Sequence, residues 1–280
     1  HSPDADDIFM YYAIKFGWVT PKDARFENIA DDIESLNQAT LKGQYDICAI
    51  SFALYPFVKD DYALLKTAVS FGDGYGPKLI KKKGTVLKKN FKVALSGEFT
   101  TNALLFKIAY PNARITYLNF LEIEEAVLNG TVDAGVLIHE SILTYNQELE
   151  VEREMWDIWV ELSGGNLPLP LGGMCLRRSI PLNNAINYEN TLIKAVDVAN
   201  KNRKVLSKML LEKGLIRVNA ETLDKYLDLY ANDDSVKMSE IQYKALDKLY
   251  ELGYKNGFYE NLVKSQDFLI PSEYEELRAR

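Results

Sequence analysis

A single internal histidine stands where a strand-like run ends. His139 follows the apolar run 135–138 and precedes Glu140 and Ser141, which open a helix-like segment; the only other histidine is the terminal His1. The positive end of a helix dipole disfavours an imidazolium, so we expect His139 to be neutral and able to accept a proton at pH 7. A lone histidine is commonly structural, but this position favours a general base.

A turn rich in small polar residues leads from the strand-like run 91–95 into a helix-like run. The N–H groups at a helix start and nearby hydroxyls together form an anion site. Helix capping alone requires one hydroxyl residue, and this turn offers several. It lacks the spaced glycines and the lysine of a phosphate loop. We therefore predict substrate contacts from Ser96, Thr100, Thr101 and Asn102.

Two further segments follow or enter predicted strands. Ser51 comes directly after the run 46–50, where ligands of open α/β sheets bind, although a plain strand exit fits equally well. The stretch 164–173 is rich in glycine, proline and leucine and predicts a rigid loop lining a cleft, with Leu169 and Gly172 as contacts. A simple turn into the next strand is the alternative.

The segment 2–7 reads Ser-Pro-Asp-Ala-Asp-Asp and precedes an apolar helix-like run. Serine, proline and aspartate are typical of helix starts, and aspartates favour the positive end of the helix dipole. The functional alternative places the whole segment, with Pro3 and Asp4 as contacts, at the rim of a cleft. Because carboxylates repel an anion, backbone N–H groups rather than aspartate side chains would then face the ligand.

Other site chemistries find little support. One interior histidine and two dispersed cysteines, Cys48 and Cys175, cannot supply a zinc set, so we expect no metal. The chain has no Gly-x-Ser-x-Gly elbow and no dinucleotide fingerprint, and we expect no cofactor. Each cysteine lies in an apolar run, which favours buried free thiols and a reducing compartment, although a disulfide between them stays open.

Strand-like and helix-like segments alternate over the first two-thirds of the chain, which predicts an α/β fold with parallel sheets and crossover helices. Predicted strands are 25–30, 46–51, 65–70, 91–96, 114–118, 133–138, 158–162 and 173–176. Predicted helices between them are 33–42, 101–109, 122–129 and 140–148. From about residue 186 the pattern becomes helical, over 191–213, 220–231, 239–252 and 259–263.

Two segments predict crossings between lobes: the glycine- and lysine-rich stretch 72–90 and the polar stretch 177–184. They predict a hinged, two-lobed molecule with a ligand cleft between the lobes. Lobe 1 would comprise 1–86 and 177–280, and lobe 2 would comprise 87–176.

Charge and hydropathy exclude two classes of partner. A net charge of −7 argues against a nucleic-acid surface, and the lysine cluster 81–92 is typical of a solvated hairpin or linker. Apolar runs are too short to span a bilayer. The chain starts at His1 without methionine, so we expect the native N-terminus, with a further strand or leader, to lie upstream.

Together these segments resemble the 1,4-dihydroxy-6-naphthoate synthases of the futalosine route to menaquinone. The shared motifs, in family order, are SPDADDIFMYYA (2–13), SFALYPFV (51–58), GDGYGP (72–77), SGEFTTNALL (96–105), GVLIHESILTY (135–145) and LPLPLGG (167–173). The last two are the most specific. One departure is that the strand which the family places before SPDADD is missing.

The resemblance implies a type II periplasmic-binding-protein-like fold used as a cytoplasmic, cofactor-free carbon–carbon lyase. The substrate would be cyclic dehypoxanthine futalosine, a small carboxylate. His139 would be the general base, and Ser51, Thr100 and Thr101 would contact carboxylate or hydroxyl groups. Two alternatives stay open on the same fold: a solute-binding or sensor protein for a small carboxylate, and the sister chorismate dehydratase, from which the IHES motif points away. The oligomeric state is not predicted.

Overall fold

A first sheet is built around one long strand. The computed structural model describes residues 1–231 and 233–271 of the chain. The strand β9 (Leu169–Arg177) pairs antiparallel with three others, which are β1 (Ile47–Ser51), β2 (Tyr62–Leu64) and β3 (Ser70–Gly72). The register places Ser51 opposite Gly172. Two residues predicted for the site therefore lie side by side on neighbouring strands.

The second sheet has the order β6-β5-β7-β4-β8. Its pairs β5–β6 and β5–β7 are parallel, whereas β4 runs antiparallel to both β7 and β8. The strands are β4 (Lys78–Lys82), β5 (Lys92–Leu95), β6 (Arg114–Tyr117), β7 (Ala134–Leu137) and β8 (Leu149–Glu154).

Helices surround both sheets. Those of the second lobe are α4 (Thr101–Ala109), α5 (Ile123–Leu128) and α6 (Met155–Ser163). Those of the first lobe are α1 (Ala5–Lys15), α2 (Ile33–Leu41), α3 (Tyr55–Val58), α7 (Leu182–Lys201), α8 (Arg203–Glu212), α9 (Ala220–Tyr230), α10 (Asp233–Val236) and α11 (Glu240–Lys255). Short 3₁₀ turns cover Phe52–Leu54, Phe120–Glu122, His139–Ile142 and Ser265–Phe268.

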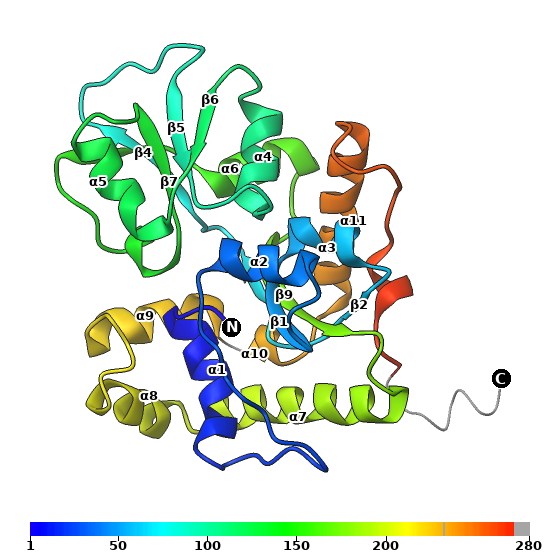
Figure 1. The fold of residues 1–280 in the computed structure, drawn as a ribbon. Helices are drawn as coiled ribbons and strands as arrows, with labels where there is room; N and C mark the ends of the chain where they lie inside the picture. Colours follow the sequence, from blue (N-terminus) through cyan, green and yellow to red (C-terminus); the bar gives the residue numbers. More distant parts are fainter. Residues whose placement is uncertain (232, 272–280) are drawn as a thin grey trace.

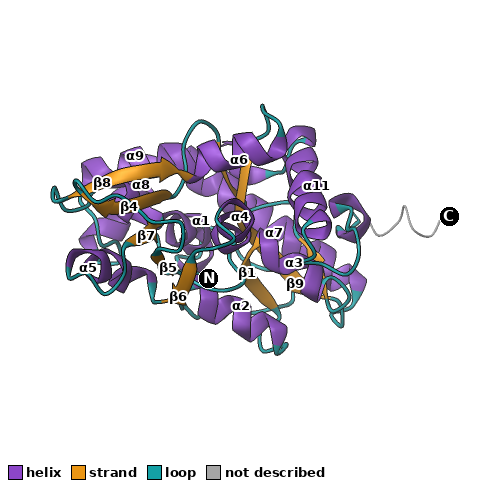
Figure 2. Ribbon diagram, turned by 90° about the horizontal axis from the view of Figure 1, so that it is seen from above, coloured by secondary structure: helices purple, strands orange, loops and turns teal. Residues whose placement is uncertain are grey.

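The two lobes can be followed in Figure 1, where the second sheet with α4–α6 lies above α1 and α7–α9. Seen from above, β4 and β8 lie beside each other in the second sheet, while β1 and β9 lie together in the first (Figure 2). Helix α1 packs on α7, α2 on β1, and α5 on β7. Burial of these apolar faces stabilises each lobe at roughly 25 cal/mol per Å² of apolar surface.

The first crossing between the lobes lies within the predicted stretch 72–90, whereas the return lies earlier than the predicted stretch 177–184. The predicted boundaries 86/87 and 176/177 assign residues 78–82 to lobe 1 and residues 169–176 to lobe 2. Strand pairing instead places β4 in the second sheet and β9 in the first. The chain crosses at 73–77 and returns at 164–168. Both turns depend on glycine: a Cβ on Gly72 would lie 2.2 Å from the Tyr75 carbonyl oxygen, and Gly164 ends α6 in the left-handed conformation.

Several predicted strands are wrong. Residues 25–30 alternate in burial but pair with no strand among the described residues. The run 65–70 is interrupted because Ala68 adopts a positive φ of 55°, so β2 ends before it and β3 begins after it. Residues 158–162 belong to α6, where Met155, Ile158 and Trp159 follow the helical rather than the strand period. The expectation of parallel sheets is also wrong for most pairs.

The helix predictions are confirmed for α2, α4, α5, α9 and α11, within a few residues at each end. The predicted helix 140–148 is a 3₁₀ turn at its start and is not helical beyond Ile142. The predicted helix 259–263 is an irregular segment, in which Tyr259 and Val263 are nevertheless buried. The predicted helix 191–213 is divided at Asn202 into α7 and α8.

The lysine cluster 81–92 is solvated over most of its length, since Lys83, Lys88, Lys89 and Lys92 are exposed, and only its start belongs to strand β4. Lys78 and Lys81 lie in β4, where their ammonium groups pair with Glu154 and Glu152 of the neighbouring strand β8. Cross-strand charge pairs of this kind stabilise a sheet by about 0.2–1 kcal/mol each. Across 1–231 and 233–271, no helix has the length and apolar character needed to cross a membrane.

Candidate functional site

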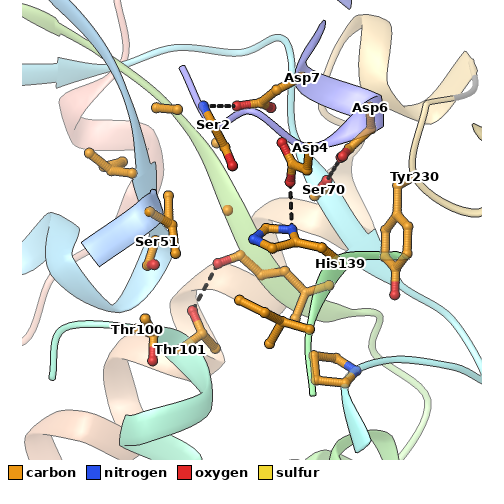
Figure 3. Close-up of a pocket in the computed structure, with 18 of the residues that line it drawn as sticks. Ser2, Asp4, Asp6, Asp7, Ser51, Ser70, Thr100, Thr101, His139 and Tyr230 are labelled. Atoms are coloured by element: carbon orange, nitrogen blue, oxygen red, sulfur yellow. Dashed lines mark hydrogen bonds and ion pairs between the residues drawn. The ribbon is translucent and has the colours of Figure 1, made fainter. Parts of the chain in front are cut away.

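A cavity lies between the two lobes, where α1, β1 and β9 face the start of α4 and the end of β7 (Figure 3). The structure brings eight of the predicted site residues to its wall: Asp4, Ser51, Ser96, Thr100, Thr101, Asn102, His139 and Gly172. These residues come from five separate parts of the sequence. Their roles remain predictions, and their convergence is the geometric finding.

His139 occupies a strained backbone position directly after β7. Its φ of 54° is in the left-handed region, which costs a residue other than glycine about 1–3 kcal/mol. The conformation turns the chain out of the strand into the 3₁₀ turn His139–Ile142. Phe120 packs edge-on against the imidazole with ring centroids 4.8 Å apart. Backbone and aromatic packing together fix the ring in the cavity wall.

One imidazole nitrogen is bound and the other is free. Nδ1 of His139 lies 2.5 Å from Oδ2 of Asp4, whereas Nε2 is buried and has no hydrogen-bond partner in the described part of the chain. Asp4 is the N-cap of α1, yet its side chain makes no capping hydrogen bond. Its carboxylate is directed to the histidine instead (Figure 3). With the Nδ1 proton donated to Asp4, Nε2 is left as a proton acceptor.

The electrostatic surroundings of this pair differ from the sequence prediction. Burial acts to lower the pKa of His139, but the Asp4 carboxylate outweighs it and holds this pKa above the ordinary value. Burial acts likewise to raise the pKa of Asp4, and His139 outweighs it, so the pKa of Asp4 is lowered. The predicted cause of a lowered His139 pKa, a helix dipole, is absent, because only a four-residue 3₁₀ turn follows the residue, and the Asp4 carboxylate that faces it acts in the opposite direction.

Glu140 ties the histidine-bearing turn to the other lobe. Its Oε1 accepts a hydrogen bond of 2.9 Å from the Ala5 N–H, and its Oε2 lies 3.7 Å from Nη2 of Arg217. The carboxylate therefore occupies the N-terminal end of α1, where the helix dipole favours negative charge. Asp4 and Ala5 belong to the first lobe, and His139 and Glu140 to the second, so the histidine–carboxylate pair exists only while the lobes touch.

The start of α4 forms the opposite wall. Thr100 caps the helix, since its Oγ1 accepts from the Ala103 N–H at 3.1 Å and donates to the Gly97 carbonyl at 3.0 Å. Thr101 Oγ1 donates to the Leu171 carbonyl at 3.0 Å. Both hydroxyls therefore have protein partners. In contrast, Ser96 Oγ and Asn102 Oδ1 are buried without a partner in the described residues, which leaves them for a ligand.

Ser51 is held in place by a residue that the sequence did not point to. Its N–H donates to Oδ1 of Asn37 at 2.9 Å, and Nδ2 of Asn37 donates to the Ser51 hydroxyl oxygen at 3.1 Å. The hydroxyl proton is left to face the cavity. Gly172 lies opposite on β9, where a Cβ would come within 3.1 Å of the Ile50 carbonyl oxygen. Glycine there lets the strands approach closely.

Two predicted contacts lie outside the cavity wall. Leu169 is fully buried and packs against Gly76, whereas Leu171 lines the cavity. A regular strand would place these two side chains on one face, but the pairing of β3 with β9 has a bulge between them. Pro3 is half-buried, and its carbonyl accepts a 3.5 Å hydrogen bond from Nη2 of Arg217.

Further polar side chains of the wall were not among the predicted contacts: Ser2, Asp6, Asp7, Ser70, Tyr226 and Tyr230. The two aspartates belong to the motif 2–7, which the functional alternative places at the rim of a cleft, but only backbone N–H groups were expected to face the ligand there. The tyrosines lie four residues apart on one face of α9, a spacing that predicts an apolar helix face and carries no sign of a site. Among residues 1–231 and 233–271, no three histidine, cysteine or acidic side chains are grouped to hold a metal ion.

Comparison with known proteins identifies the family of this chain. A family model described as menaquinone biosynthesis matches residues 1–255 of the 280. This chain belongs to the menaquinone biosynthesis family. It is 29% identical over 253 residues to a 1,4-dihydroxy-6-naphthoate synthase of Streptomyces coelicolor, with 88% of each chain covered. It is 28% identical to the enzyme of the same name from Thermus thermophilus, over 89% of this chain and 90% of that one.

Solved structures extend the comparison to the fold. A protein of Archaeoglobus fulgidus is 33% identical and superposes with a TM-score of 0.85, over 92% of this chain and 96% of that one. The periplasmic aliphatic sulphonate-binding protein of Escherichia coli is 12% identical with a TM-score of 0.62, over 96% and 89%. This second likeness concerns the fold alone. It confirms the predicted two-lobed, periplasmic-binding-protein-like architecture of this menaquinone biosynthesis family member.

Asp7 makes this family member's stability depend on pH. Burial, followed by the charge of Asp4, raises the pKa of Asp7 from 3.8 to about 7, so the folded state retains a proton that the unfolded chain releases. The contribution of Asp7 to the free energy of unfolding is fully present below about pH 4 and is lost as the pH rises through about 7. The full effect would be about 4 kcal/mol, and partial exposure reduces it to about 2 kcal/mol.

We therefore expect Asp7→Asn to melt several degrees above the wild type at pH 8 and at the same temperature near pH 4. Asparagine can still accept the 2.8 Å hydrogen bond from the Ser2 N–H. Thermal unfolding followed by circular dichroism across this pH range checks the prediction. An equal difference at both pH values would contradict it.

Proposed function

We propose that this chain is a 1,4-dihydroxy-6-naphthoate synthase, a carbon–carbon lyase that converts cyclic dehypoxanthine futalosine into the bicyclic naphthoate. Family membership and the two curated relatives of that name support the proposal. The observation that carries it to a mechanism is the free Nε2 of His139, buried in the cavity wall and oriented through Nδ1 by Asp4.

The proposed mechanism requires one base. His139 Nε2 removes a proton from the sugar-derived part of the substrate, and the carbon–carbon bond then breaks toward an aromatic ring. A general base contributes about 10²–10⁴-fold, and its efficiency is greatest when its pKa lies near the working pH. Aromatisation supplies driving force, so orientation and exclusion of water by the closed lobes are the remaining needs. We propose that the reaction needs no cofactor and takes place in the cytoplasm.

The charges around the cavity support one substrate orientation. Aspartates gather at the α1 end, whereas the α4 end offers the free Ser96 hydroxyl as a donor beside a helix N-terminus. Asn102 lies in the same wall, and its Nδ2 group would be the donor, because its unpartnered Oδ1 can only accept. A carboxylate is repelled by the first end and accepted by the second. We propose that the substrate carboxylate lies at Ser96 and Asn102, with the sugar-derived hydroxyls toward His139.

Two neighbouring substitutions test this orientation. We expect Ser96→Ala to raise KM by about 10–100-fold at nearly constant Tm, because it removes a hydrogen bond to a charged group worth about 1.5–3 kcal/mol. Thr100→Ala removes the α4 cap at a cost of about 1 kcal/mol, so it should lower Tm by a few degrees and change KM less. Steady-state kinetics and thermal melts compare the two variants. Unchanged KM in Ser96→Ala would place the carboxylate elsewhere.

The function itself is tested by incubating the protein with cyclic dehypoxanthine futalosine. Naphthoate detected by mass and ultraviolet absorbance is the expected result. Saturable binding without turnover would favour a solute-binding protein, and turnover of chorismate would favour the sister dehydratase. A net charge of −7 supports a small-molecule partner rather than a nucleic acid.

A further inference from the structure

A second carboxyl group in the cavity wall is buried and incompletely bonded. Asp6 is 3% exposed, and its Oδ2 accepts a hydrogen bond of 2.9 Å from the Ser70 hydroxyl. Its Oδ1 is buried and has no hydrogen-bond partner in 1–231 or 233–271. Asp6 and His139 line the same cavity, and Asp6 lies beside the histidine–Asp4 pair in Figure 3.

The charges around Asp6 disfavour its ionised form. Among the described residues no lysine, arginine or histidine forms an ion pair with it, and its acidic neighbours are Asp4, Asp7 and Glu140. Burial first, and then Asp4 and Asp7, raise the pKa of Asp6 well above its ordinary value. The remaining titratable groups that sense its charge are Tyr11, Tyr226 and Tyr230. A buried carboxyl without a cation retains its proton.

Asp4 and Asp6 thus have opposite environments two residues apart. Burial acts to raise the pKa of both carboxyl groups. At Asp4 the charge of His139 outweighs burial and lowers the pKa. At Asp6 the charges of Asp4 and Asp7 add to burial, and the Ser70 hydroxyl opposes them only in part. Groups whose environments push their pKa values apart mark the base and the acid of a site. One carboxyl supports the base, and the other has a proton to give.

We propose that Asp6 is a further catalytic residue, the proton donor that works together with His139. The inference rests on the proposed lyase function and adds the acid that the single base leaves unassigned. His139 Nε2 takes the proton of a substrate hydroxyl, and the electron pair of that O–H bond forms a carbonyl as the neighbouring carbon–carbon bond breaks. The pair from that bond moves through the ring system to a carbonyl oxygen of the ring.

The Asp6 proton then passes to that oxygen, which becomes a ring hydroxyl. His139 is left protonated and Asp6 ionised, and transfer of one proton between them restores both groups. Electrons and protons balance, so this step uses no oxidant or reductant. The arrangement also places the donor where the negative charge of the reaction develops, which is the strongest single way to lower a barrier of this kind.

The test compares Asp6→Asn with the wild type on cyclic dehypoxanthine futalosine between pH 6 and 10. Asparagine keeps the size of the side chain and can accept from Ser70, but it has no acidic proton. We expect kcat to fall by about 10²–10⁴-fold, KM to change little, and the alkaline limb of the wild-type pH profile to disappear. If the wild type turns over the substrate and Asp6→Asn is equally active, the proposal is overturned. An alkaline limb that is unchanged in Asp6→Asn would overturn it as well.

Ser70→Ala gives a second test that keeps the carboxyl. The Ser70 hydroxyl stabilises the ionised form of Asp6, so its removal raises the pKa of Asp6 further. We expect the alkaline limb of kcat/KM to move to higher pH in this variant. A limb that stays in place would overturn the proposal even if Asp6→Asn fails to fold. A wild-type protein without turnover would overturn the proposed function, and the assignment of Asp6 would fall with it.

Discussion

Replacement of His139 by asparagine is expected to lower kcat by about 10²–10⁴-fold while the protein stays folded. Asparagine has no proton-accepting nitrogen, so the free Nε2 position is lost. Its amide can still donate to Asp4, which avoids leaving a buried carboxylate unpaired, a defect that costs about 3–5 kcal/mol. Turnover of cyclic dehypoxanthine futalosine and the thermal melt of the same preparation measure both effects.

His139→Ala is the matched comparison, because it removes the ring and also the partner of Asp4. We expect it to lose as much activity as the asparagine variant and in addition to melt several degrees lower. If His139→Asn retained substantial activity with a normal melting curve, His139 would not be the base. The pairing with Asp4 would then be a structural contact between the lobes.

Asp4→Asn is expected to reduce kcat nearly as strongly, by about 10²–10⁴-fold, although this side chain touches no reacting atom in the proposed mechanism. The asparagine amide would donate to Nδ1, which places the imidazole proton on Nε2 and removes the acceptor. The pKa of His139 should fall as well, because burial then acts without the opposing carboxylate. The acidic limb of the kcat/KM profile should therefore move to lower pH.

The control is Asp7→Asn, which removes a carboxyl from the same turn of α1 but leaves the Asp4–His139 pair intact. It should move the acidic limb much less than Asp4→Asn does. Asparagine is as good an N-cap as aspartate, so the start of α1 is preserved in the Asp4 variant. Equal shifts in the two variants would mean that Asp4 acts through its charge alone rather than by fixing the tautomer.

Local sequence determined the parts of the site that depend on neighbouring residues. The strand β5, the turn at 96–102 and the start of α4 were all predicted, because strand period, hydroxyl caps and helix period are short-range signals. The position of His139 at the end of β7 followed in the same way. The motifs also indicated the family, which the comparison confirmed.

Only the tertiary structure decided the partners of these residues. The hydrogen bond from the Ala5 N–H to Glu140 joins positions 135 residues apart, and no periodicity encodes such a contact. The same holds for Asp4, whose position predicted a cap and whose side chain instead faces His139. The direction of the pKa shift of His139 was misjudged for this reason, since a pKa depends on burial and on charges brought close by folding.

The strand errors have the same origin. The charged strands β4 and β8 lacked the apolar pattern of a strand, because pairing with each other turns their lysines and glutamates into cross-strand ion pairs. The sequence thus determined which local segments could carry chemistry. The meeting of the two lobes decided which side chains face one another, since burial and electrostatic pairing arise only when distant segments exclude water together.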